Sequence, residues 1–138
     1  MSFDRLRAEI PAALDLLSLL AFFAPDDIER EMIVSGREKL PAALAQAVSS
    51  PVSLDDAVAA LRRYSLIDVR ENTFAVHRLV QAVTRDRLAE GEADKQWAEA
   101  ALRVVNGAFP FRLNEVETWG RSSRLLPHAL AAAGAEDR

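Results

Sequence analysis

The sequence predicts a mainly α-helical fold with one small β-hairpin. Along most of the 138 residues, apolar side chains recur every three or four positions, as they do on one face of a helix. Around residues 66–76 this period changes to two, which is typical of strands. Half of the residues are hydrophobic and 28% are charged, a composition that indicates a folded domain rather than a disordered chain.

The first 34 residues predict three helices. Pro11 divides the first apolar repeat into a short lead-in helix and a main helix at Ala12–Phe23, because proline interrupts a helix interior. A short helix is expected at Ile28–Val34. Asp26 or Asp27 is placed to cap this helix by accepting hydrogen bonds from its free backbone amides.

Two more helices are expected before the strands. Ser35-Gly36 is a stop signal, and the next helix is predicted at Leu40–Val48. A further helix is predicted at Leu54–Tyr64. Ser53 and Asp56, which are three residues apart, have the spacing of a capping box at its start.

The segment with a period of two predicts the hairpin. Ile67 and Val69 alternate with polar residues, and Phe74 and Val76 continue the alternation after a short turn at Glu71-Asn72.

A returning helix is expected at Arg78–Glu90, and Gly91 is a suitable stop. Its residues expected to face inward are Leu79, Val80, Val83 and Leu88. Short helices, a hairpin and a returning helix together indicate a winged-helix domain over residues 1–91. In that fold the hairpin is the wing, and the helix before it lies where a recognition helix would lie.

Residues 92–138 predict a helical linker unit. One helix is expected at Asp94–Phe109 with Trp97 inward, and a second one follows near the C-terminal end, with Pro127 marking a kink or a start. Small and large apolar residues mixed at helical spacing suit a helical hairpin that stacks on its neighbours. We therefore expect helical repeats to follow in the natural polypeptide.

Composition excludes several kinds of chemistry. The chain has no cysteine, which rules out disulfides and thiolate sites, and its formal net charge of −4 disfavours nucleic acid as a partner. Glycine-rich phosphate loops and nucleophile elbows are both missing from the sequence, so we expect no enzyme activity within this chain. The longest apolar run is too short to cross a bilayer, so a cytoplasmic location without membrane contact is expected.

Five fragments in one order resemble a known family. They are "LLSLLAFFAPDDI", "ALRRYSLIDV", "FAVHRLVQAVTRDRL", "WAEAALRVVNGAFP" and "RLLPHALAAA". Together they resemble the region between the nucleotide-binding module and the tetratricopeptide repeats of bacterial STAND ATPases of the NB-ARC type. The resemblance covers nearly the whole chain. It implies a winged-helix domain that relays signals between an upstream nucleotide-binding module and downstream repeats of the same polypeptide.

The resemblance also assigns a role to His77. In that family a histidine of the MHD motif, at the start of the helix after the wing, approaches the β-phosphate of bound ADP and holds the inactive state. Val76, His77 and Arg78 occupy the three places of the motif here. Arg78 replaces an acidic residue, so only His77 is carried over. ADP or ATP is expected in the parent protein, with no cofactor in the isolated chain and no metal.

Three alternatives remain open. His77 can be a structural imidazole that is bonded to a nearby backbone carbonyl. Arg62, Arg63 and Arg70 would contact phosphates if the domain were a DNA-binding transcription regulator, although Asp55 near the start of the same helix would repel the DNA backbone. The chain can also be an adaptor that binds partner proteins through its C-terminal helices.

Overall fold

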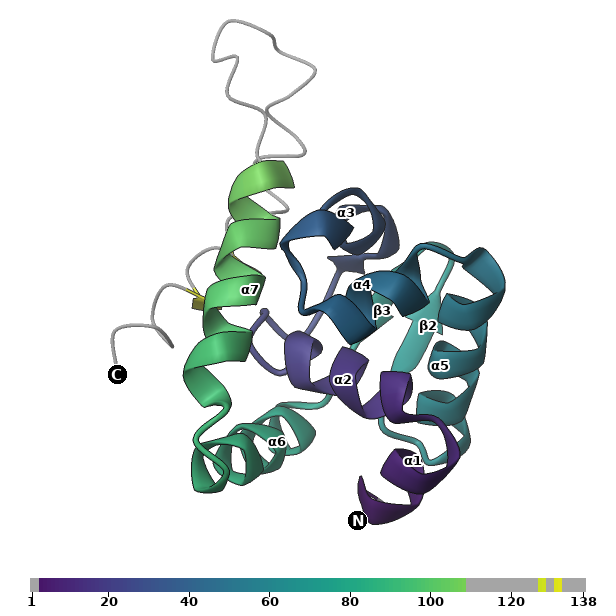
Figure 1. Ribbon diagram of the computed structural model, residues 1–138, viewed down its shortest axis with the longest axis vertical. Helices are drawn as coiled ribbons and strands as arrows, with labels where there is room; N and C mark the ends of the chain where they lie inside the picture. Colours follow the sequence, from purple (N-terminus) through teal and green to yellow (C-terminus); the bar gives the residue numbers. More distant parts are fainter. Residues whose placement is uncertain (1–2, 109–126, 129–130, 133–138) are drawn as a thin grey trace, which may run out of the picture.

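The computed structural model of the chain describes residues 3–108, 127–128 and 131–132 (Figure 1). It confirms a mainly helical fold with a small antiparallel sheet, here of three strands. The elements in chain order are α1 (Phe3–Glu9), α2 (Pro11–Leu20), β1 (Ile28–Glu29), α3 (Arg30–Ser35), the 3-10 helix η1 (Arg37–Lys39), α4 (Ala42–Val48), α5 (Pro51–Arg63), β2 (Asp68–Arg70), β3 (Thr73–Ala75), α6 (Arg78–Glu90) and α7 (Asp94–Ala108). None of the helices in these described ranges combines the length and apolar character needed to cross a membrane.

Helix α2 lies at the centre of the molecule. It packs against α1, α4, α5, α6 and α7, and Figure 1 shows α7 and α5 on opposite sides of it. Its apolar residues do not form a narrow stripe, and the four leucines at positions 16, 17, 19 and 20 are completely buried. A helix that is hydrophobic on most of its circumference is stable only when other elements cover it on all sides, as they do here.

The C-terminal end of α2 is held by polar groups of α6. The side-chain amide of Gln81 donates hydrogen bonds to the carbonyls of Leu20 (3.1 Å) and Phe23 (2.8 Å), and Arg85 donates to the carbonyl of Ala21 (2.8 Å). The last carbonyls of a helix have no partner within the helix, and burial keeps water away from these. Gln81 and Arg85 therefore supply donors that the end of α2 needs.

These contacts correct the predicted inward face of α6. Val80, Val83 and Leu88 are half-buried, but Leu79 is 63% exposed. Gln81 must face α2, and residues two positions apart on a helix point about 200° away from each other. Leu79 is consequently turned toward the solvent.

The sheet has the strand order β1-β3-β2, with Phe74 in the middle strand paired to Ile28 on one side and Val69 on the other. The predicted hairpin and its turn at Glu71-Asn72 are confirmed. The prediction of a helix throughout Ile28–Val34 was wrong at its start, because Ile28 and Glu29 form β1 and the helix begins at Arg30. Pairing with a strand more than 40 residues away decided this conformation, and no local pattern reports such a contact.

Two predicted caps were also wrong. Helix α3 has Glu29 at its N-cap position without a side-chain hydrogen bond, so neither Asp26 nor Asp27 caps it. Helix α5 begins at Pro51, and its cap is Ser50, whose hydroxyl accepts from the amide of Ser53 (3.4 Å). Proline suits the first helical position because its missing N–H would have no partner there. This moves the start of the helix three residues before the predicted one.

Helix α7 shares the core of the preceding elements. Its buried residues, which belong to the same apolar cluster as α2, are Trp97, Ala98, Ala100, Ala101, Val104 and Val105. The predicted division into residues 1–91 and 92–138 stays a prediction. Most of the predicted last helix lies outside the described residues, where only 127–128 and 131–132 are included.

We expect Gln81→Ala to lower the free energy of unfolding by about 2 kcal/mol, because it removes the side-chain donor of the Phe23 carbonyl and one of two donors of the Leu20 carbonyl, and leaves a gap beside α2. Urea denaturation followed by circular dichroism would measure this loss. Gln46→Ala is the matched control, since Gln46 is exposed on α4. The control should change stability by less than about 0.5 kcal/mol. Equal effects of the two substitutions would contradict the capping role of Gln81.

Candidate functional site

His77 lies between the sheet and α6, in the N-cap position of the helix. Just before it, the amide of Val76 donates to the carbonyl of Pro25 (2.8 Å), and the Val76 side chain is buried. The Nδ1 atom of His77 accepts a hydrogen bond from the amide of Leu79 (3.1 Å). The imidazole is therefore positioned by its own helix, while the side chain remains exposed to solvent.

The cap determines which nitrogen of His77 can donate. A neutral imidazole has one N–H donor and one acceptor nitrogen. Because Nδ1 accepts from Leu79, the proton lies on Nε2, which is then able to donate to an external oxygen. For a structural histidine we expected a backbone carbonyl as partner; the partner is a backbone amide instead.

The residues after His77 form an exposed surface with it. Arg78 and Leu79 are both exposed, and Leu79 is one of the two most exposed large apolar side chains among the described residues. We call His77, Arg78 and Leu79 the junction surface. It presents a hydrogen-bond donor, a positive charge and an apolar group next to one another.

Of the three arginines predicted as alternative DNA contacts, Arg62, Arg63 and Arg70, one is already paired with a carboxylate. Arg63 forms an ion pair with Glu9 (3.3 Å), and Glu9 also accepts from the hydroxyl of Tyr64 (3.1 Å). Arg62 is exposed near the end of α5, and Arg70 is exposed on β2.

Acidic residues share the exposed face of α5 with these arginines. Asp55 and Asp56 are exposed near its start, and Asp55 forms an ion pair with Arg30 of α3 (2.6 Å). The exposed charges of α5 are thus two aspartates and two arginines, Arg62 and Arg63, which cancel. A helix that contacts DNA usually carries an excess of positive charge.

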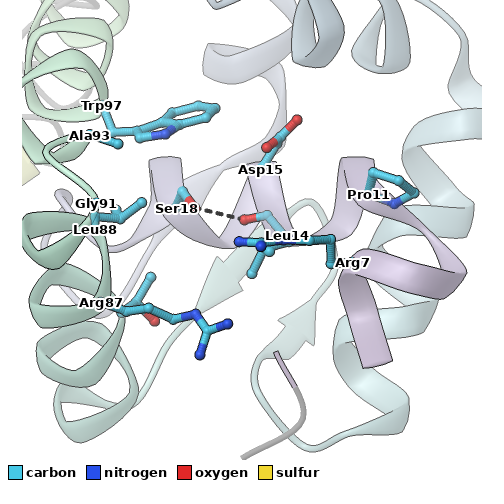
Figure 2. A pocket seen from close by; sticks show the side chains of 11 residues that line it. Arg7, Pro11, Leu14, Asp15, Ser18, Arg87, Leu88, Gly91, Ala93 and Trp97 are labelled. Carbon is cyan, nitrogen blue, oxygen red and sulfur yellow. Dashed lines mark hydrogen bonds between the residues drawn. The ribbon is translucent and has the colours of Figure 1, made fainter. Parts of the chain in front are cut away.

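A cavity of about 430 Å³ lies where α1 and α2 meet α6 and α7 (Figure 2). Its apolar lining includes Leu14, Leu88 and Trp97, and its charged lining consists of Arg7, Asp15 and Arg87. Two hydroxyl groups of the lining already have hydrogen-bond acceptors. Ser18 donates to the carbonyl of Leu14, and Thr84 donates to the carbonyl of Val80, each one turn earlier in the same helix. His77 does not line this cavity.

Asp15 is the unusual residue of this cavity. Burial raises the pKa of its carboxyl group, and the positive charge of Arg7 partly offsets that effect. In the sequence Asp15 is only an interruption of an apolar run, so its spacing gave no reason to single it out.

His128 is a second residue that the sequence did not single out. It is buried against the loop after α2, and both of its ring nitrogens lie within hydrogen-bond distance of backbone atoms of that loop. Within the described ranges, no group of three or more histidine or carboxylate side chains is arranged to hold a metal ion.

We expect Asp15→Asn to raise the free energy of unfolding at pH 7 by on the order of 0.5 kcal/mol, a value reduced for solvent screening of a partly exposed charge. A raised pKa means that the folded state holds the proton more tightly than the unfolded state. The ionised carboxylate of Asp15 therefore destabilises the folded state to its full extent at pH values above the pKa of the folded protein. This effect disappears as the pH falls toward about 3.9, the ordinary value for aspartate.

Urea denaturation of both proteins between pH 7 and pH 4 would test this expectation. The two stabilities should converge as the pH falls. Asp86→Asn is the control, since Asp86 is exposed on α6. A less stable Asp15→Asn variant at pH 7 would mean that attraction to Arg7 outweighs the cost of burial.

One comparison with known proteins identifies a family. No curated protein and no solved structure matches the chain significantly. A family model described as a domain of unknown function matches residues 1–93, which run from the N-terminal end through α6. Because this match covers more than half of the 138 residues, the chain belongs to the family of the domain of unknown function DUF7779.

Proposed function

We propose that this chain is a non-catalytic regulatory winged-helix domain of a STAND ATPase of the NB-ARC type. It relays conformational changes between an upstream nucleotide-binding module and downstream helical repeats. His77 acts in it as a sensor of the β-phosphate of ADP. The observation that carries the proposal is the capped and exposed imidazole of His77, whose Nε2 is available as a donor while Nδ1 is bonded to Leu79.

The order of the elements supports the winged-helix part of the proposal. Helices α2, α4 and α5 pack against one another, β1 lies between α2 and α4 in the chain, and the β2–β3 hairpin follows α5. The hairpin pairs with β1 through its second strand, which leads directly to His77. The wing thus positions the residue that we assign to the nucleotide.

The chemistry of the junction surface fits a diphosphate. The Nε2–H group of His77 would donate to a phosphate oxygen, and the positive charge of Arg78 would add attraction. Bound ADP would supply the negative charge to which these groups respond. One hydrogen bond to a charged group contributes about 1.5 to 3 kcal/mol, which shifts a two-state equilibrium by about tenfold or more. That contribution is enough to bias a switch and too small to bind a nucleotide alone.

The proposal also places a protein partner on the junction surface. Such a contact would cover the side chain of Leu79, which is 63% exposed in this chain, and remove its apolar area from water. We assign this contact to the upstream nucleotide-binding module of the same polypeptide. The exposed positive and negative charges of α5 are equal in number, so a DNA-binding regulator is the weaker alternative. An adaptor role would use the C-terminal helices and leave the junction surface without a ligand.

The test compares two substitutions of His77 in a longer protein that includes the predicted upstream module. His77→Ala removes both the helix cap and the phosphate donor. His77→Ser keeps a side chain that can cap α6 but is too short to reach a phosphate in the same way. We expect both variants to lose bound ADP or to exchange it at least about tenfold faster than wild type.

Thermal unfolding of the 138-residue chain provides the control for the cap. His77→Ala should unfold at a lower temperature, and His77→Ser should stay close to wild type. If His77→Ser retains ADP as well as wild type does, the histidine only caps the helix and the proposed sensor role is wrong.

A further inference from the structure

The loop formed by residues 24–27 is held from two directions. On one side, the carbonyl of Pro25 accepts from the amide of Val76, the residue before His77. On the other side, Nδ1 of His128 accepts from the amide of Ala24 (3.1 Å), and its Nε2 lies 2.9 Å from the carbonyl of Asp27. The loop therefore connects a residue more than 100 positions away to the start of the candidate site.

The His128 ring fits this loop closely. It is 1% exposed, and it meets the ring of Phe23 edge to face at a centroid distance of 5.7 Å. Because Nδ1 accepts from Ala24, Nε2 carries the proton and donates to the carbonyl of Asp27. A single neutral tautomer thus satisfies both ends of the loop.

The loop also stores strain that needs such support. Asp27 has a φ of 57°, in the left-handed region that residues other than glycine seldom adopt. Such a conformation persists when the surrounding structure holds it. The next residue, Ile28, begins β1 and pairs with Phe74 of β3. Displacement of the loop would therefore act on β3 and on Val76 together.

We infer that His128 is a positioning residue that couples the C-terminal segment of this chain to the His77 junction through the loop 24–27. Removal of the ring would release the amide of Ala24 and the carbonyl of Asp27. The hydrogen bond from Val76 to Pro25 would then open more often. The relevance of this coupling to a nucleotide rests on the proposed function, whereas the coupling itself depends only on this chain.

Protonation would break the same contact. A proton on Nδ1 would face the amide proton of Ala24, so the imidazolium cannot keep both hydrogen bonds. Burial lowers the pKa of His128, and this effect outweighs the opposing influence of the Asp27 carbonyl and of the negative charges of Asp27 and Glu29. A lowered histidine pKa means that the unfolded chain binds the proton more readily. The contact is thus complete above about pH 6.5 and is lost as the pH falls through the folded pKa.

Amide hydrogen exchange of the 138-residue chain, followed by NMR, tests the coupling. In His128→Ala the protection factors of the Ala24 and Val76 amides should fall by about tenfold, as expected for the loss of one hydrogen bond. The control amide is that of Leu66, which donates to the carbonyl of Leu61 at the end of α5 and should keep its protection. Unchanged protection of Val76 in His128→Ala would overturn the inference.

A second variant decides the outcome if His128→Ala is unstable as a whole. His128→Gln keeps one acceptor and one donor and does not titrate, so it should retain the protection of Val76. Both proteins are then compared across the pH range in which the ring resonance of His128 titrates. Wild type should lose Val76 protection in that range and His128→Gln should not. Identical pH profiles would overturn the coupling, whatever the ADP retention of the longer protein shows.

Discussion

The fold depends on the complete burial of α2 and on the polar groups that its C-terminal end requires. A helix with so many leucines must be covered on all sides, and five other helices cover it. Its last carbonyls are then shielded from water and need donors from the protein. Gln81 and Arg85 of α6 supply them, so the end of α2 fixes both the position and the rotation of α6.

The exposed junction surface is a consequence of that rotation. With Gln81 turned inward, Leu79 has to face the solvent, and His77 begins α6 just after the middle strand of the sheet. The capping bond stabilises the start of α6 and at the same time directs the available N–H of the imidazole away from the helix. The local requirement of the helix and the proposed role of His77 are thus compatible, and one geometry serves both.

Burial shifts the pKa values of Asp15 and His128 in opposite directions. It favours the neutral form of each, which raises the pKa of Asp15 and lowers that of His128. Asp15 lies beside a cavity, where a positive charge offsets only part of the cost. His128 has a backbone partner for each nitrogen, so its neutral form contributes to the structure. The polar groups of the loop 24–27, rather than exposure, decide the tautomer of that histidine.

Apolar periodicity by itself determined the helices around Pro11, the hairpin with its turn at Glu71-Asn72 and the helix at Arg78–Glu90, because each depends on contacts between near neighbours in the chain. His77 could be singled out at the strand–helix junction for the same reason. Contacts between distant segments decided the rest. Ile28 became a strand by pairing with Phe74, and Leu79 was exposed because Gln81, two positions later, is needed at the end of α2. His128 acquired its role only when a loop 100 residues earlier folded around it, and no spacing in a sequence can report such an encounter.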